Sequence, residues 1–566
     1  MERSAAPLAA RPPLSRVHRP SIRAAPAGDC ASAVTSVASR AMNPTARRIR
    51  FAAALAFLAC VTRTAPASPL QFVVPGDPVE AELRVLDLYA PGPERGGLKL
   101  PHLDAAPWQV IELLPDSAAA AATGRVAGPR GIAGRRIARA LERDASVLGS
   151  AGRSTPRAFE GAWPDGTRAE LSLGLEGERD VVRQDGANSS RFVDGSGVHA
   201  RAALQADRWL AYSHLWFGEL RGVRAYSDAL VANSDIAAST DESSLSYSAP
   251  AWSAQLGHGR WSWGPGEEGS LMLSRTMPAV NGLMLHMRLA PLHADAFIFD
   301  ATVEPGTGEQ LAAHRLEWQP RDGVRLGLSE SARYKAGGWQ GVYLAGVIPY
   351  SVAQRLLDRE HADSTGVLRN NVMLAADASV RVADGSRAYA EILIDDLHAR
   401  AADVPNKYGG QAGWSGTGTV DGTRLTWDAE YTWLSRYVYT SFFGRSYVAQ
   451  GQPLGFFTGP DARRLRARVT LDPDTDWQLA LVASRTDHGS EGLNDPFVPG
   501  GPVPDVNQLA GTVERTRSLT ASTRWWPASG VDLSLSAGRQ WVDDAGNVAG
   551  AQTNAWTGSF AFRITR

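Results

Sequence analysis

The end of the chain alternates regularly between apolar and polar side chains. Every second position is taken by Trp556, Gly558, Phe560, Phe562 and Ile564, and the residues between them are small, polar or charged. Successive side chains of a β-strand point to opposite faces, so this period of two predicts a strand with one apolar and one polar face. The same pattern recurs through most of the preceding 400 residues.

Two internal segments show the alternation without interruption. In residues 425–433 every odd position is apolar and every even position is polar or charged. Residues 464–471 alternate in the same way, and the Asp-rich turn 472–476 joins them to a further alternating strand that begins at Trp477, so the three pieces predict a β-hairpin.

The length of these strands favours a membrane protein. The apolar phase continues for about ten residues, as in strands that span a bilayer. Strands of a soluble β-sandwich, which is the alternative, usually have about 5–6 residues. The sequence therefore predicts an all-β fold, a transmembrane antiparallel β-barrel of about 16–18 strands over residues 156–566.

Loop lengths give the predicted barrel an orientation. The connections at 472–476 and 527–530 are short, whereas residues 485–507 form a long loop rich in Gly and Pro on the opposite side. Bacterial barrels place their short turns in the periplasm. Counting strands from this rule brings the C-terminus to the periplasmic side.

The region before the barrel has a different pattern. Residues 78–90, 106–122 and 132–148 carry apolar residues at helical spacing, which predicts three short amphipathic helices. We expect a periplasmic helical region over residues 68–155 whose apolar stripes pack on one another or on the barrel rim. The alternative is that these helices dock onto a periplasmic partner or plug the pore from below.

The first 67 residues resemble an export signal. Arginines at 47, 48 and 50 precede the apolar run 51–61, and the small residues 65–67 follow it. A basic, an apolar and a small-residue region in this order predict a secretory signal peptide, and we expect Met42 to be the true start of the gene. We therefore exclude residues 1–67 from the fold.

Composition excludes several classes of partner and cofactor. The whole chain has a net charge of −1 at pH 7, and loss of the Arg-rich leader makes it more acidic, which argues against a nucleic-acid partner. Both cysteines, Cys30 and Cys60, lie in the leader, so the mature chain has no disulfide and no Cys metal site. The sequence implies no metal and no cofactor.

One motif resembles a known family. Residues 257–266 read Gly-His-Gly-Arg-Trp-Ser-Trp-Gly-Pro-Gly, and Ser-Leu-Met-Leu-Ser follows at 270–274. This region resembles the capsule-assembly Wzi family, and the resemblance extends over residues 75–566. It implies an outer-membrane barrel of about eighteen strands with a periplasmic helical bundle and lectin-like retention of capsular polysaccharide. Residues 275–277 are Arg-Thr-Met, where related sequences tend to carry Asn-Asn-Ala.

The motif also supplies candidate carbohydrate contacts. Trp261 and Trp263 offer flat faces on which sugar rings stack, and Glu267 and Glu268 offer acceptors for hydroxyl groups. The alternative is that the two tryptophans belong to an interfacial aromatic girdle and that residues 264–266 only turn the chain.

Three arginines form a second candidate site. Arg464, Arg466 and Arg468 share the polar face of one strand, and exposing each to lipid near the midplane costs about 2–4 kcal/mol, so we expect them in the lumen. Arg binds carboxylates through two parallel hydrogen bonds, which suits the uronic acids of an acidic capsule. The alternative is a structural network in which inward carboxylates neutralise the row: Asp428, Glu430, Glu391 and Asp395.

A Gly-rich segment at 409–418 lacks the context of a nucleotide-binding loop. We interpret it as a mobile loop, in which Tyr408 and Trp414 are further candidate sugar contacts. Catalytic motifs of the G-x-S-x-G or H-E-x-x-H type do not occur in the chain. The adjacent pair Asp487 and His488 would point apart on an extended strand, so we predict that the protein is not an enzyme.

These observations predict an outer-membrane lectin-like protein of a Gram-negative cell envelope. We expect a monomer that binds and organises capsular or extracellular polysaccharide and contacts outer-membrane lipid. The alternative is a porin-like channel for sugars or anions. An interior with more balanced charge pairs than a conducting pore needs would favour the lectin.

Overall fold

The alternating segments form long strands in the structure of the chain, a computed structural model. The structure describes residues 70–73, 78–89, 109–112, 128–144, 159–184, 187–189, 194–221, 229–230, 234, 236–304, 306–335, 341–344, 349–350, 352, 370–396, 404–441, 444–528 and 530–565. The predicted signal peptide at 1–67 lies outside these residues.

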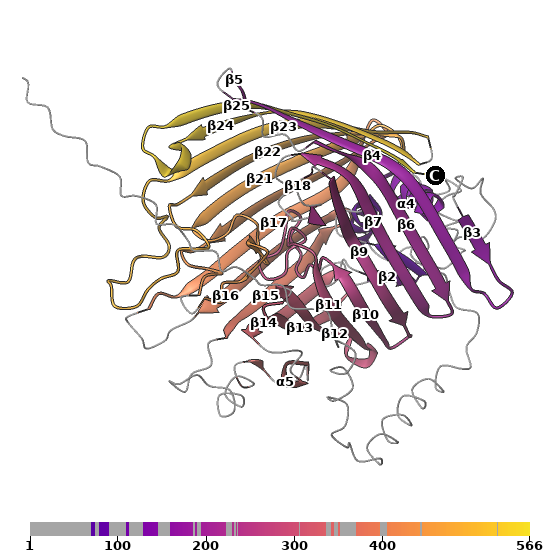
Figure 1. The fold of residues 1–566 in the computed structure, drawn as a ribbon, viewed down its shortest axis with the longest axis horizontal. Helices are drawn as coiled ribbons and strands as arrows, with labels where there is room; N and C mark the ends of the chain where they lie inside the picture. The colour runs from indigo at the N-terminus through magenta and orange to yellow at the C-terminus, as the bar shows by residue number, and fades with distance from the viewer. Residues whose placement is uncertain are drawn as a thin grey trace, which may run out of the picture. The chain divides into compact units, whose positions relative to one another are not determined.

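In this part of the chain, eighteen strands pair in an antiparallel ring (Figure 1). They are β4 (Arg168–Gln184), β6 (Asp194–Ala206), β7 (Trp209–Arg221), β9 (Ile236–Ser248), β10 (Trp252–Gly259), β11 (Val280–Leu289), β12 (Ala294–Glu304), β13 (Glu309–Arg321), β14 (Val324–Lys335), β15 (Asn371–Ala383), β16 (Ser386–Asp396), β17 (Lys407–Val420), β18 (Thr423–Leu434), β21 (Ala462–Asp472), β22 (Trp477–His488), β23 (Glu514–Ala528), β24 (Val531–Asp543) and β25 (Gln552–Thr565). The last strand, β25, pairs with β4 and closes the ring, so the predicted barrel is confirmed.

Shorter elements accompany the ring. They are strands β1 (Leu70–Val73), β2 (Gln109–Glu112), β3 (Phe159–Ala162), β5 (Ala187–Ser189), β8 (Ala229–Leu230), β19 (Val448–Ala449) and β20 (Gln452–Pro453), helices α2 (Pro78–Asp87), α4 (Gly128–Asp144) and α5 (Gly341–Leu344), and the 3-10 turns η2 (Ala290–Leu292) and η3 (Ala545–Asn547). No helix among the described residues is both long enough and apolar enough to cross a membrane.

The two faces of the strands differ as the alternation predicts. On β22, Leu479 and Leu481 point outward and are 42% and 49% exposed. On β25, Trp556 and Phe560 are also exposed on the outer surface. A closed barrel pairs all of its backbone groups internally, and an outer wall of such side chains suits hydrocarbon.

Short turns gather at one end of the barrel, which we call the short-turn end. Examples are residues 207–208, 384–385 and 473–476. The backbone N–H of Thr565 donates to Gly530 O (2.8 Å) beside the turn between β23 and β24, so the C-terminus lies at this end, as predicted. The connections at the opposite, long-loop end include residues 260–279, 435–461 and 489–513.

The helical predictions before the barrel are partly confirmed. Helices α2 and α4 occur where residues 78–90 and 132–148 predict them. The prediction of a helix over 106–122 is wrong at its described part, because residues 109–112 form β2 and pair with β1. A segment as short as Gln-Val-Ile-Glu does not distinguish helix from strand, and pairing with a remote strand decided the outcome.

The prediction of a mobile loop over residues 409–418 is also wrong, because these residues lie inside β17. The glycines there make room for aromatic rings on adjacent strands. A Cβ atom on Gly413 would lie 2.2 Å from the Tyr389 hydroxyl, and one on Gly416 would lie 2.2 Å from the Trp427 ring. Gly is normally depleted in strands, and here close packing explains its presence.

The outer wall is not apolar over its full height. Three polar side chains point outward, as exposed Leu328 does, and are nevertheless buried. They are Asp300 on β12 and Glu330 and Tyr334 on β14. The Tyr334 hydroxyl donates to Asp300 Oδ2 (2.8 Å), and the backbone N–H of Tyr350 donates to Glu330 Oε2 (2.8 Å). Helix α5 contacts β12 and β13, so the chain after β14 folds back over the outside of the barrel and shields these polar groups.

We predict that Leu481→Arg destabilises the barrel in a lipid bilayer by about 2–4 kcal/mol, because the side chain lies on the outer wall. Denaturant unfolding from liposomes measures this loss. The matched control is Val548→Arg, since Val548 is 60% exposed on the connection between β24 and β25. Equal losses in the two variants would contradict a hydrocarbon environment at Leu481.

Candidate functional site

The segment between β10 and β11, residues 260–279, folds into the barrel. We call it the inserted segment. Trp261 and Trp263 on it are 0% and 1% exposed and pack on Phe299 of β12, with ring centroids 4.4 Å and 6.3 Å apart. The alternative that these tryptophans form an interfacial girdle is therefore wrong. Protein atoms cover both rings, and they belong to the largest apolar cluster of the described residues.

The carboxylates of the inserted segment bind the barrel wall. Glu267 pairs with Arg387 of β16 (2.9 Å). Glu268 accepts two hydrogen bonds from Arg464 of β21, at 2.6 Å and 2.7 Å, in the bidentate geometry that strengthens such pairs. These two glutamates were predicted as acceptors for sugar hydroxyls, and the structure shows them as anchors of the segment.

Backbone groups of the inserted segment are also bound by acidic side chains of the wall. The N–H of Glu267 donates to Glu430 Oε2 (2.8 Å), and the N–H of Leu271 donates to Glu391 Oε1 (3.0 Å). The amide of Gln411 donates to Gly269 O (3.0 Å). Strands β16, β17 and β18 thus hold a segment that starts on β10.

The arginine row of β21 faces the lumen, as predicted. Arg464 pairs with Glu268, and Arg466 pairs with Asp428 of the neighbouring strand. Arg468 Nε donates to Thr470 Oγ1 (3.1 Å). Of the four carboxylates expected to neutralise the row, Asp428 does so. Glu391 and Glu430 bind the inserted segment instead.

A second inserted segment, residues 435–441 and 444–461, covers the first from the long-loop end. The Tyr439 hydroxyl donates to Leu271 O (2.5 Å), and its backbone N–H donates to Asp395 Oδ2 (2.8 Å). Ser274 N–H donates to Leu454 O (2.9 Å). Burial raises the pKa of Tyr439 well above its ordinary value, so its hydroxyl stays a neutral donor.

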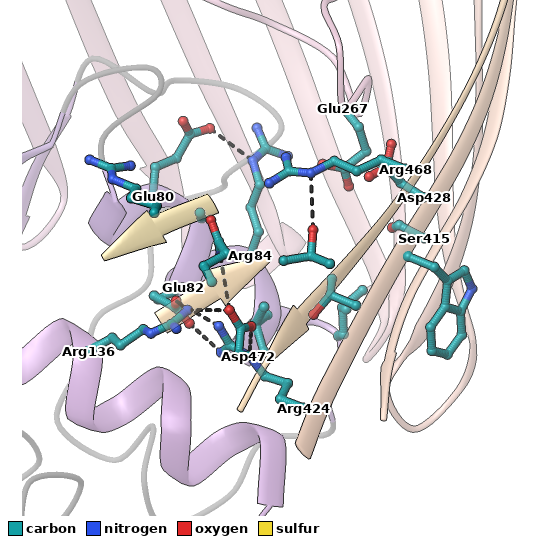
Figure 2. A pocket seen from close by; sticks show the side chains of 18 of the residues that line it. Glu80, Glu82, Arg84, Arg136, Glu267, Ser415, Arg424, Asp428, Arg468 and Asp472 are labelled. Atoms are coloured by element: carbon teal, nitrogen blue, oxygen red, sulfur yellow. Dashed lines mark hydrogen bonds and ion pairs between the residues drawn. The ribbon is translucent and has the colours of Figure 1, made fainter. Parts of the chain in front are cut away.

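Helix α2 closes the short-turn end through a buried ionic cluster (Figure 2). Glu82 accepts from Arg424 of β18 at 2.5 Å and 2.8 Å, and from Arg136 of α4 at 3.1 Å. Asp472, at the end of β21, accepts from Arg424 (2.6 Å) and Arg136 (2.8 Å). Burial raises the pKa of Glu82, but the two guanidinium groups outweigh it and hold that pKa below its ordinary value.

Helix α2 also contacts other turns and the inserted segment. Asp87 forms two hydrogen bonds with Arg325 of β14 (2.6 Å and 2.7 Å), and Leu88 O accepts from Gly385 N–H (3.0 Å). Glu80 lies 3.2 Å from Arg275 Nη2 of the inserted segment. The helix therefore connects the wall, its turns and the inserted segment. The sequence carried no signal for these partners, which lie hundreds of residues apart.

The remaining candidate residues lie on the wall or the rim. Trp414 points outward from β17, is 56% exposed, and donates from Nε1 to Ser386 Oγ (2.6 Å). Tyr408, at the long-loop end of β17, donates to Asn507 Oδ1 (2.7 Å) of the connection between β22 and β23. The structure therefore does not bring Trp414 to the rim with Tyr408.

The Asp487 and His488 side chains do not form a dyad. Asp487 pairs with Arg485 (2.8 Å) and Arg515 (3.3 Å). The His488 ring contacts Gly489 O through Nδ1 (2.7 Å). The two side chains thus make separate contacts, as alternation along the strand predicts.

Comparisons with known proteins bear on this arrangement. The model of the family described as capsule assembly protein Wzi matches residues 176–555, more than half of the chain. The chain belongs to the capsule assembly protein Wzi family. The resemblance of residues 257–266 and 270–274 is thereby confirmed. No curated protein matches the sequence.

One solved structure resembles this Wzi-family chain in fold, and other outer-membrane proteins match it more weakly. That structure is described as Wzi, an outer membrane protein involved in group 1 capsule assembly in Escherichia coli and a carbohydrate-binding β-barrel. It is 14% identical with a TM-score of 0.58, and the match covers 87% of this chain and 99% of that one. OccAB1 of Acinetobacter baumannii is 8% identical with a TM-score of 0.41, and the match covers 70% of this chain and 96% of that one. OprD of Pseudomonas aeruginosa is 9% identical with a TM-score of 0.38, and the match covers 70% of this chain and 95% of that one.

We predict that Arg424→Met frees α2 from the barrel. The substitution leaves the buried Glu82 and Asp472 with only Arg136 as a shared partner, and breaking a buried pair from one side costs about 3–5 kcal/mol. Hydrogen exchange of residues 78–89 should rise strongly, whereas exposed Arg485→Met should leave it unchanged. Unchanged exchange in Arg424→Met would show that other contacts hold the helix.

We predict that acid also loosens α2. Since the folded pKa of Glu82 is depressed, its contribution is complete above its unfolded pKa of about 4.3 and is lost as pH falls through the folded value. The protection of α2 amides against hydrogen exchange, taken relative to the intrinsic exchange rate at each pH from pH 6 downward, should therefore fall below about pH 4. Glu82→Gln should lack this component, and an identical acid response in both proteins would refute the assignment to Glu82.

Proposed function

We propose that this Wzi-family barrel is an outer-membrane lectin that holds capsular or extracellular polysaccharide at the surface of a Gram-negative cell. Family membership supports this proposal, as does the fold shared with a barrel described as carbohydrate-binding. The long-loop end faces outward in this proposal. Helices α2 and α4 at the short-turn end then lie in the periplasm, because bacterial barrels place short turns there.

One observation carries the choice of a lectin over a channel: inserted segments fill the lumen, and most of the charged side chains that the structure describes there are paired. Two inserted segments cross it from the long-loop end, and α2 occupies the short-turn end. Arg315 of β13, paired with Asp377 and Glu317, is one of several wall pairs that continue the same neutralisation. A conducting pore for sugars or anions requires a continuous aqueous path.

We propose that the protein acts by binding and not by catalysis. Its polysaccharide contacts belong to the long-loop end, where Tyr408 meets the connection between β22 and β23. The paired Arg464 and Arg466 hold the inserted segment beneath this surface and present guanidinium groups to acidic sugars that displace Glu268. Trp261, Trp263 and Glu267 shape the same segment from within. We propose a monomer, because one chain closes the ring.

We predict that deleting the gene in its encapsulated host releases polysaccharide into the medium at unchanged total synthesis. The measurement compares cell-attached with shed polysaccharide. Expression of the wild-type chain should restore attachment, and the purified protein should show no conductance in planar bilayers. Unchanged attachment together with open-channel conductance would replace the lectin by the porin-like alternative.

A variant pair connects this phenotype to the inserted segment. Arg464→Gln with Arg466→Gln removes the cations that face Glu268, so complementation by this variant should restore less attachment than wild type. Arg485→Gln, at a side chain that is 51% exposed on the outer wall, is the matched control and should complement fully. Full complementation by both variants would assign the row a purely structural role.

A further inference from the structure

A cavity of about 350 Å³ remains in the filled lumen, between α2, the inserted segment and the strands β17, β18 and β21 (Figure 2). This volume lies at the lower end of the range for small-molecule sites. More arginines than carboxylates line it. The arginines are Arg84, Arg136, Arg275, Arg387, Arg424, Arg468 and Arg524, and the carboxylates are Glu80, Glu82, Glu267, Asp428 and Asp472.

Most of these carboxylates are already neutralised. Glu82 and Asp472 are shared by Arg424 and Arg136, and Glu267 is paired with Arg387. Asp428 is bound by Arg466, which does not line the cavity. Among the described residues that line the cavity, positive charge is therefore in excess, and the excess lies on Arg468 and Arg275.

Arg468 has unused hydrogen-bonding capacity. Within the described part of the chain, its one hydrogen bond joins Nε to Thr470 Oγ1 (3.1 Å), and no carboxylate oxygen lies within the 4.0 Å of an ion pair. A guanidinium has five N–H donors, so the terminal nitrogens of Arg468 remain available to an acceptor in the cavity. Figure 2 places Arg468 beside Glu267 and Asp428.

Arg275 adds buried donors from the inserted segment. Its Nε and Nη2 are buried and have no hydrogen-bond partner among the described residues. The nearest acid is Glu80, 3.2 Å from Nη2, and Glu80 already accepts from Arg84 (2.9 Å). Leaving a charged donor buried without an acceptor is costly, so a ligand acceptor would stabilise this arrangement.

We propose that this cavity binds an anionic group, a carboxylate or phosphate on a ligand of about one sugar unit, through Arg275 and Arg468. Planar guanidinium groups bind both anions through paired N–H donors, and a dry site strengthens such bonds. The cavity lies next to α2, so it is distinct from the rim where Tyr408 lies. The inference does not rest on the lectin function, because a lectin without this site would still retain polysaccharide at its outer end.

The test measures binding to the purified full-length mature barrel in detergent by calorimetry. The probes are glucuronate, inorganic phosphate and glucose, at fixed ionic strength. We expect glucuronate or phosphate to bind and glucose not to bind. Arg275→Gln with Arg468→Gln should weaken anion binding at least tenfold, and Arg485→Gln with Arg517→Gln should leave it unchanged, since both arginines are about half exposed on the outer wall.

Two further comparisons complete the test. Preference for glucuronate identifies a carboxylated sugar as the source of the anion, and preference for phosphate identifies a phosphorylated ligand. Arg468→Lys keeps the charge but loses the planar donor pair, so it should bind with intermediate affinity even where the double variant folds poorly. Equal binding of glucose and glucuronate, no binding of any probe, or full affinity in the double variant would each overturn the proposal.

Discussion

The structure depends on one constraint: charge that lipid excludes must be neutralised inside the barrel. A strand of period two that places leucines in hydrocarbon necessarily directs its alternate side chains into the lumen. On β21 these inward side chains are Arg464, Arg466 and Arg468. Bringing several guanidinium groups into a narrow interior is unfavourable unless carboxylates meet them. The inserted segments and α2 supply many of those carboxylates.

The ion pairs that neutralise the inward charges of the wall are thus the same contacts that close the lumen. Glu267 and Glu268 neutralise Arg387 and Arg464 and thereby anchor the inserted segment. Glu82 neutralises Arg424 and thereby anchors α2. Each ionic pair fixes a piece of chain across the pore. A barrel built in this way cannot gain a wide aqueous path without breaking buried pairs.

Local pattern predicted the strands well and individual roles less well. The alternation at 425–433 and 464–471 appears in the structure as β18 and β21 with the expected faces. The sequence analysis predicts a loop over the Gly-rich residues 409–418, but they form a strand in which rings of Tyr389 and Trp427 occupy the space that side chains would need. For Trp261 and Trp263 the sequence offers a sugar platform or an interfacial girdle, but the segment that carries them turns inward and buries both rings.

The sequence by itself determined the fold class, the two faces of each strand, the side of the turns and the family resemblance. These follow from the spacing of a few neighbouring residues, because the geometry of a strand decides to which face each side chain points. Only the tertiary structure decided which carboxylate pairs with which arginine. Glu82 and Arg424 lie 342 positions apart, and Glu268 and Arg464 lie 196 apart. Partners at such separations are chosen by ring closure and loop insertion, for which local periodicity carries no signal.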